Sequence, residues 1–195
     1  NAFTGAVSLN TTGSGGNAEI YPGTTNLVFG TSSVGNLTVT TGSGSAVTQT
    51  GVLTVDGATD ITANDGGNNI RLEGQENVLT GAVSLDGWNV RLTNAKALEL
   101  GTIDSRALEL TARGAITQTV PSVITSVGSS TIIAQNSAGS TDYDVTLENA
   151  ANDFRGALIL TAGNVRVKDT DGVELGASTV SGIYNLTAGG AVSDS

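Results

Sequence analysis

The stretch Asn77-Val-Leu-Thr-Gly-Ala-Val-Ser-Leu85 has a close copy on each side of it in the chain. The copies read Asn1-Ala-Phe-Thr-Gly-Ala-Val-Ser-Leu9 and Asn152-Asp-Phe-Arg-Gly-Ala-Leu-Ile-Leu160, so the three opening Asn residues are almost evenly spaced. A sequence that recurs at a nearly fixed step indicates an array of similar units, in which each unit packs its apolar face against its neighbours. We therefore expect an elongated repeat structure.

A second phrase recurs in the same way. Ala46-Val-Thr-Gln-Thr50 is matched by Ala115-Ile-Thr-Gln-Thr119, and residues 51–63 then align with residues 122–134. The distance from the opening Asn to this phrase is longer in the first copy, from Asn1 to Ala46, than in the second, from Asn77 to Ala115. We expect the extra residues of the first copy to form a projecting loop at 13–25.

These copies divide the chain into internal repeats of about 1–76, 77–151 and 152–195, within a single solenoid domain that spans residues 1–195. The last repeat is incomplete, so we expect the chain to be a piece of a longer array with unpaired strand edges at its two ends. A polar stretch at 135–142 predicts a second projecting loop.

Short segments of alternating apolar and polar residues recur every 8–12 residues along the chain. Examples are Leu53-Thr-Val55, Val90-Arg-Leu92 and Leu98-Glu-Leu100. Such alternation is typical of a β-strand with one buried face, and the residues between the segments favour turns. No segment has the roughly 3.6-residue apolar period of a helix, so we predict an all-β chain with little or no helix.

Two all-β architectures fit these short strands. A β-sandwich would join antiparallel strands through turns such as Asp56-Gly57 or Asp86-Gly87. A parallel β-helix, or β-solenoid, would wind the strands into coils and stack equivalent strands about 4.8 Å apart. The long repeat favours the β-solenoid, because the same coils then recur. At roughly 20–25 residues per coil, the chain would form about eight to ten coils.

Composition limits the function of the chain. The formal net charge is −10 and only eight residues are basic, without a basic stripe, so we expect no nucleic-acid partner. No apolar run approaches the roughly 18 residues of a membrane-spanning helix, so we expect no membrane span. The chain has no Cys and no His. This excludes Ser-His-Asp and Cys-His catalysis and metal sites built from thiolates or imidazoles.

Any catalytic role would therefore fall to carboxylates, which polysaccharide-cleaving enzymes use in pairs. The candidates form three groups in the sequence: Asp56, Asp60 and Asp65; Asp142 and Asp144; and Asp169 and Asp171. Each group lies among Gly, Ser and Asn, where Asp favours turns, so we interpret these residues as turn residues.

No residue is assigned a catalytic, cofactor-binding or metal-binding role, and we predict that the chain is not an enzyme and uses no cofactor. Asp169-Thr-Asp-Gly172 begins like a calcium loop, but no Glu follows where such a loop requires one. An ice-binding array would need regular Thr-x-Thr on successive coils, and the pattern is irregular. The Thr residues concerned are Thr38, Thr40 and Thr48.

Two expectations concern single side chains. Trp88, the only Trp, is either an adhesion hot spot or, as we favour, packs over a corner of a coil. Residues that share one position in the three repeats should stack inside the solenoid. They are Phe3, Leu79 and Phe154, with Leu9, Leu85 and Leu160 pointing inward beside them.

The segments Asn89-Val-Arg-Leu-Thr-Asn-Ala-Lys-Ala-Leu-Glu-Leu-Gly-Thr-Ile103 and Ala107-Leu-Glu-Leu-Thr-Ala-Arg-Gly-Ala-Ile-Thr-Gln118 share a phrase that returns at 164–176 and 186–192. This phrase resembles repeats of large bacterial exoproteins of the filamentous-haemagglutinin type, which are secreted by the two-partner route or as autotransporters. The resemblance implies a right-handed parallel β-helix, secretion or cell-surface display, and a role in adhesion or fibre building.

We therefore predict a structural or adhesive segment of a secreted or cell-surface bacterial fibre protein. The expected partners are a receptor or glycan on a host or neighbouring cell, and further copies of the chain joined end to end. The alternative is a polysaccharide-active β-helix enzyme or a glycan-binding module.

Overall fold

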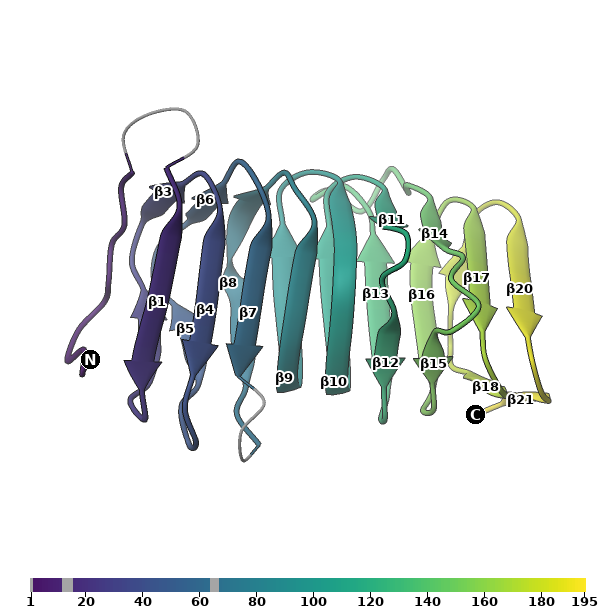
Figure 1. The fold of residues 1–195 in the computed structure, drawn as a ribbon. Helices are drawn as coiled ribbons and strands as arrows, with labels where there is room; N and C mark the ends of the chain where they lie inside the picture. The colour runs from purple at the N-terminus through teal and green to yellow at the C-terminus, as the bar shows by residue number, and fades with distance from the viewer. Residues whose placement is uncertain (1, 12–15, 64–66) are drawn as a thin grey trace.

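The computed structural model describes residues 2–11, 16–63 and 67–195 as one parallel β-solenoid (Figure 1). Short strands lie side by side along its long axis, and the two chain ends lie toward opposite ends of the solenoid. The described residues form 21 strands and no helix, and the strand pairs are parallel. It follows that no described helix is long and apolar enough to cross a bilayer. The predicted fold class is confirmed.

The register of the pairs arranges the strands in three ladders, which the chain visits in turn. The first contains β1 (Ala18–Gly23), β4 (Leu37–Thr41), β7 (Thr59–Ala63), the start of β9 (Val83–Asn94), the middle of β10 (Leu98–Ala112), β12 (Ile124–Ser126) and β15 (Asp153–Phe154). The second contains β2 (Leu27–Phe29), β5 (Val47–Gln49), the start of β8 (Ile70–Leu79), the ends of β9 and β10, β13 (Ser130–Ala134), β16 (Leu158–Ala162) and β19 (Thr179–Val180). The third contains β3 (Ser32–Val34), β6 (Leu53–Val55), the end of β8, the start of β10, β11 (Ile116–Gln118), β14 (Val145–Leu147), β17 (Val165–Asp169) and β20 (Tyr184–Ala188). In the last turns, β18 (Val173–Leu175) pairs with β21 (Val192–Asp194).

The second ladder shows how often the chain returns to the same face. Its successive partners are Leu27, Val47, Ile70, Val90, Leu108, Ser130, Leu158 and Leu175. A bridge between Val7 and Phe29 adds an earlier turn. The described chain thus makes about nine turns, within the eight to ten predicted.

Apolar side chains at alternate strand positions fill the interior. Leu98 and Leu100 are both 0% exposed, whereas Glu99 between them is exposed to solvent. Leu53 and Val55 are likewise fully buried. Each such side chain stabilises the fold by roughly 1.5–3 kcal/mol when it leaves water. The alternation predicted from the sequence is therefore confirmed, and the lateral faces carry the polar side chains.

The sequence repeat does not coincide with a whole number of turns. Val83 lies in the first ladder, but Leu158, one repeat later, lies in the second. Val90 in the second ladder is likewise followed by Val165 in the third. The step from the second copy to the third therefore covers three turns and one further face.

This offset corrects the predicted interior stack. Leu79 and Phe154 are buried, as expected, but they do not lie on each other. Leu79 pairs with Val55 and Phe154 pairs with Ser126, because repeat-equivalent residues belong to different ladders. Phe3, at the third equivalent position, is only partly buried.

The first turn is less buried than the turns in the middle of the solenoid. Leu85 and Leu160 are 1% and 0% exposed, so their predicted inward orientation is confirmed. Leu9, their equivalent in the first turn, is only partly buried, as are Phe3 and Val7. These side chains have a neighbouring turn on one side alone.

The predicted loop at 13–25 is wrong over residues 18–23. These residues form β1, which pairs with β4 and buries Ile20. Val7 lies in the second ladder and its equivalent Val83 in the first, so the first copy contains one more face than the second. The extra residues thus extend the solenoid wall, because β1 supplies that face. Residues 13–15 lie outside the described residues.

The second predicted loop, at 135–142, is confirmed. An antiparallel bridge between Gln135 and Asp142 brings its ends together. The Nε2 of Gln135 also donates to the Oδ1 of Asp142 at 2.7 Å, so the side chains close the loop as well.

Candidate functional site

Two pairs of amide side chains, each made of a buried Asn and a half-buried Gln, form where the repeated phrases meet. In the first pair, the Nδ2 of Asn77 donates to the Oε1 of Gln49 at 2.9 Å, and its Oδ1 accepts from the Nε2 of Gln49 at 2.8 Å. The Oδ1 also accepts from the backbone N–H of Leu53, and the Nδ2 also donates to the carbonyl of Leu72. The amide of Asn77 is thereby fully bonded inside the solenoid.

The second pair, Gln118 and Asn152, has the same geometry. The Oδ1 of Asn152 accepts from the Nε2 of Gln118 at 2.7 Å and from the N–H of Ile124 at 3.0 Å. Its Nδ2 donates to the Oε1 of Gln118 at 3.0 Å and to the carbonyl of Leu147 at 3.3 Å. The opening Asn of one phrase and the Gln of the other thus form one unit, which we call the Asn–Gln clamp.

The clamp of the second repeat carries a two-residue insertion. Val120 and Pro121 have no counterpart in the first repeat, where Thr50 and Gly51 are adjacent. The insertion lifts the chain away from the sheet, and the Val120 side chain is 93% exposed. The segment 118–124 is longer than its counterpart 49–53 by these two residues. This difference in length was visible in the sequence, but sequence reasoning missed the feature that it marks.

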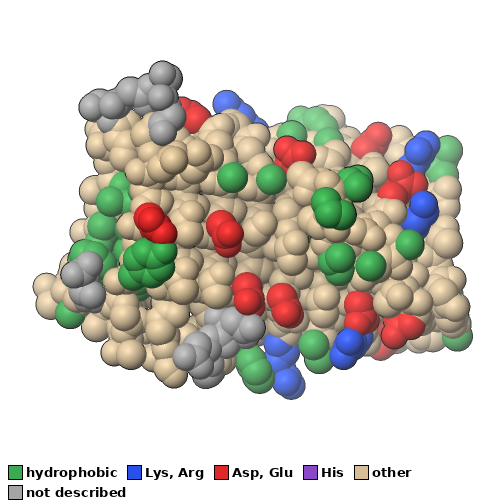
Figure 2. Space-filling model, viewed as in Figure 1, with side chains coloured by type: hydrophobic (Ala, Val, Ile, Leu, Met, Phe, Trp, Pro, Cys, Tyr) green, Lys and Arg blue, Asp and Glu red, His purple; other side chains and the backbone are tan. Residues whose placement is uncertain are grey.

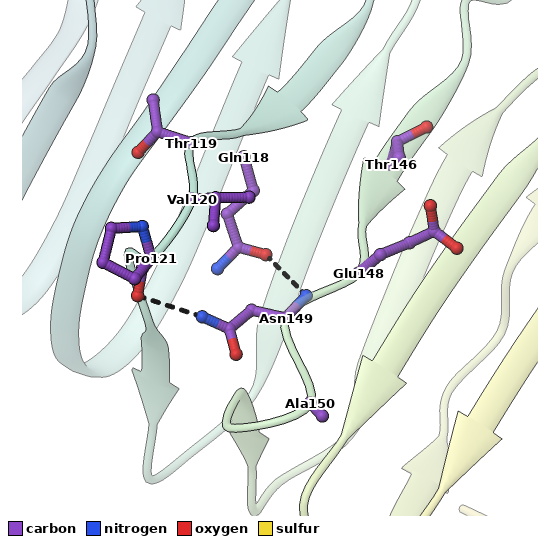
Figure 3. Close-up of a pocket in the computed structure, with 8 residues that line it drawn as sticks. All are labelled: Gln118, Thr119, Val120, Pro121, Thr146, Glu148, Asn149 and Ala150. Atoms are coloured by element: carbon purple, nitrogen blue, oxygen red, sulfur yellow. Dashed lines mark hydrogen bonds between the residues drawn. The ribbon is translucent and has the colours of Figure 1, made fainter.

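Asn149 holds the insertion in place (Figure 3). Its Nδ2 donates to the carbonyls of Pro121 at 3.0 Å and of Ser122 at 2.6 Å, and its backbone N–H donates to the Oε1 of Gln118. The corresponding residue of the first repeat is Gly74, which has no side chain to do this. The insertion and the residue that fixes it therefore occur together.

The insertion and the β14–β15 connection border a hollow of about 430 Å³ over the third ladder. Val120 and Pro121, which we call the rim, lie on one side of the hollow, and Glu148, Asn149 and Ala150 follow one another on the segment across from them (Figure 3). The other lining residues are Gln118, Thr119 and Thr146. Figure 3 shows Pro121 and Glu148 on opposite sides of the contact between Gln118 and Asn149.

A second hollow of about 400 Å³ lies over the same ladder and shares Thr146 with the first. Thr146 pairs with Arg166 on β17, and Arg166 pairs with Asn185 on β20, so these side chains form one row across the strands. The remaining lining residues are Asp144, Asn164, Val165 and Ile183. We call the two hollows together the third-face groove.

Two of the predicted carboxylates serve local structure near this groove. Asp142 closes the 135–142 loop through Gln135. The Oδ1 of Asp144 accepts from the backbone N–H of Asn164 at 2.8 Å and from its Nδ2 at 3.0 Å. Asp144 lines the groove, but Asp142 does not.

Asp169 is buried, with 4% of its surface exposed. Its Oδ2 accepts from the N–H of Phe154 at 2.8 Å and its Oδ1 from the N–H of Asp171 at 3.0 Å. Burial raises the pKa of Asp169 above its usual value, although these two N–H groups lower it. Its counterpart one repeat earlier is Asn94, whose Oδ1 accepts from the N–H of Leu79. Asp169 thus fixes a corner of the chain, in agreement with its interpretation as a turn residue.

The first carboxylate group does not assemble. Asp56 is exposed after β6, Asp60 points outward from β7, and Asp65 lies outside the described residues. Asp60 instead borders a hollow of about 370 Å³ with Asp86 and Asp104, which pair across β9 and β10. Sequence reasoning missed this grouping, because it depends on strand register. Among the described residues, no three carboxylates are placed to hold a metal ion.

The outward Thr residues form no continuous array. Thr38 pairs with Glu19 on one side and Asp60 on the other, and Thr48 pairs with Arg71. This agrees with the irregularity seen in the sequence.

Trp88 packs at a corner between two ladders. The guanidinium carbon of Arg106 lies 4.9 Å from the centre of its ring, and a Cβ at Gly67 would lie in ordinary contact with the ring. The side chain is still 44% exposed. The corner packing favoured from the sequence is confirmed.

Charges on the surface are mixed. Figure 2 shows acidic side chains over the middle of the viewed face, and basic side chains mainly toward its borders. The ion pairs within the described residues are Arg91–Glu109, Arg113–Glu76 and Arg155–Asp153. Arg166 belongs to none of these three pairs, and it lines the third-face groove.

A family model described as repeats of unknown function (DUF5649) matches residues 15–86, 87–161 and 162–195. The starts of its units, at 15, 87 and 162, are spaced much like the three opening Asn residues of the sequence. No curated protein and no solved structure gave a significant match.

Proposed function

The chain belongs to the family of repeats of unknown function (DUF5649), and from this premise we propose that it is a rigid structural segment that carries adhesive surfaces. We place it in a secreted or cell-surface bacterial fibre protein. The observation that carries the proposal is the parallel ladder that runs from Leu27 to Leu175 over a closed apolar interior. Such a ladder holds outward side chains at fixed positions along a rod.

The positions of three of the predicted carboxylates support a role without catalysis. Asp142, Asp144 and Asp169 accept hydrogen bonds that close loops and corners. A polysaccharide-cleaving enzyme needs two carboxyl groups that face one substrate bond. The proposed partners are a receptor or glycan on another cell, together with further copies of the chain that meet end to end.

Beads coated with the chain test the adhesive part of the proposal, and limited trypsin digestion tests the rigid part. We expect the native chain to resist trypsin, because its Lys and Arg residues lie on paired strands and short connections. We expect the beads to attach to bacterial or epithelial cells more than beads coated with an unrelated acidic protein. Rapid digestion would contradict the rigid role, and equal attachment would contradict the adhesive role.

A further inference from the structure

We propose that the third-face groove binds an uncharged oligosaccharide. This inference rests on the adhesive part of the proposed function and names the ligand class and the surface. The groove spans β11, β14, β17 and β20, from the Val120–Pro121 rim to Asn185.

The Val120–Pro121 rim is an addition to the repeat and is held in place by specific hydrogen bonds. The two copies of the Asn–Gln clamp are alike, so the fold does not need the inserted Val120 and Pro121. Asn149, where the first repeat has Gly74, bonds to the carbonyls behind the insertion and fixes it. A rim that is rigid before binding lowers the entropy cost of binding a ligand.

The chemistry of the groove matches a sugar chain. A sugar ring has apolar faces of C–H groups and an edge of hydroxyls that both donate and accept. The apolar rim can cover a ring face, and Glu148 offers two acceptor oxygens at the opposite wall. Arg166 and Asn185 supply donors in the next two turns.

The charges favour an uncharged ligand. Acidic Asp144 and Glu148 line the groove together with basic Arg166, and basic Lys168 lies two positions after Arg166 on β17, so charges of both signs occur at the groove. The whole chain carries −10, which repels polyanions such as sulfated glycans.

The strand arrangement disfavours an extended peptide. Backbone N–H and C=O groups of β14 and β17 already pair with neighbouring strands on both sides, so a peptide has no free edge to join on this face. Recognition must come from side chains in rows about 4.8 Å apart. This spacing is close to the length of one sugar unit in an extended chain.

The test measures binding of the full chain to an array of oligosaccharides of glucose, galactose, mannose and N-acetylglucosamine. Heparin fragments and extended peptides are tested in the same way as competing ligand classes. We expect binding to an uncharged oligosaccharide, measured by calorimetry. Glu148→Gln should weaken it about tenfold, because a charge-assisted hydrogen bond is lost. Deletion of Val120 and Pro121 should weaken it similarly.

Glu73→Gln is the matched control, because Glu73 is the counterpart of Glu148 in the first repeat. It should leave affinity unchanged, and both variants should melt close to the parent. The proposal is overturned if no uncharged oligosaccharide binds, if heparin or a peptide binds better, or if Glu148→Gln and Glu73→Gln have equal effects. If beads coated with the Glu148→Gln variant attach to cells as well as beads coated with the parent, the groove is not the binding site, and the adhesive role is unaffected.

Discussion

Neighbouring residues on one strand differ sharply in what they contribute to stability. Leu100 lies inside the solenoid and Glu99 faces water. We expect Leu100→Ala to lower the free energy of unfolding by about 2–5 kcal/mol, because it leaves a cavity. Glu99→Ala should change it by less than about 0.5 kcal/mol. Urea unfolding measures both, and similar losses from the two variants would contradict the alternation.

The buried carboxyl of Asp169 predicts a pH dependence. Its pKa is raised in the folded state, mainly by burial, above the usual 3.8. The folded state therefore holds the proton more tightly than the unfolded state, and its contribution to stability is greatest below 3.8. That contribution is lost as the pH rises through the raised pKa.

Asp169→Asn restores the residue found at the equivalent position, Asn94. We expect the variant to be more stable than the parent at neutral pH, because burial disfavours the charged carboxylate of Asp169 and not the neutral amide of Asn. Below the usual pKa of Asp the two proteins should melt alike. Thermal melting across this range decides the matter, and a parent that gains stability with rising pH relative to the variant would refute the assignment.

At the scale of elements, the Asn–Gln clamp ties one turn to the next. Asn152→Ala would leave the N–H of Ile124 and the carbonyl of Leu147 without these partners inside the solenoid, and it would remove both hydrogen bonds to the half-buried Gln118 amide. We expect a loss of about 3 kcal/mol or more, because each buried unpaired group costs about 1–3 kcal/mol. Thr117→Ala on the exposed side of the same turn should cost less than about 0.5 kcal/mol. Denaturant midpoints that match for the two variants would show that the clamp is dispensable.

The elements were also the scale at which the sequence was most informative. Alternation at Leu53 and Leu98 predicted strands correctly, because a buried face imposes a period of two whatever the neighbouring strand is. The loop at 13–25 was predicted wrongly over 18–23. The Gly and Ser residues of that region indicated a loop, although Ile20 among them points inward from a strand.

The third-face groove was beyond reach of the sequence for a different reason. Thr146, Arg166 and Asn185 become neighbours through strand register, which the repeat alone does not reveal because equivalent residues change ladder. Only the unmatched Val120 and Pro121 marked its position in the sequence.

At the scale of the whole molecule, the solenoid should hold ligands without cleaving them. We expect no release of reducing sugar from acidic or neutral polysaccharides, because Asp142 and Asp144 are bonded to Gln135 and Asn164 instead of facing each other across a substrate. Turnover that disappears in the Asp142→Asn, Asp144→Asn double variant, or on changing Asp169 and Asp171, would replace the structural role by an enzymatic one.

The second copy of the opening phrase and the third are offset by one side of the three-sided rod. Val83 and Leu158 occupy the same place in their phrase on two different sides of the rod, as do Val47 and Ile116 in theirs. A surface feature encoded once per repeat at this offset would wind around a longer array and come back into line only after three repeats. Such a rod would present each repeated surface feature on all three of its sides. A partner could therefore bind from any side of the rod, without a preferred orientation around its axis.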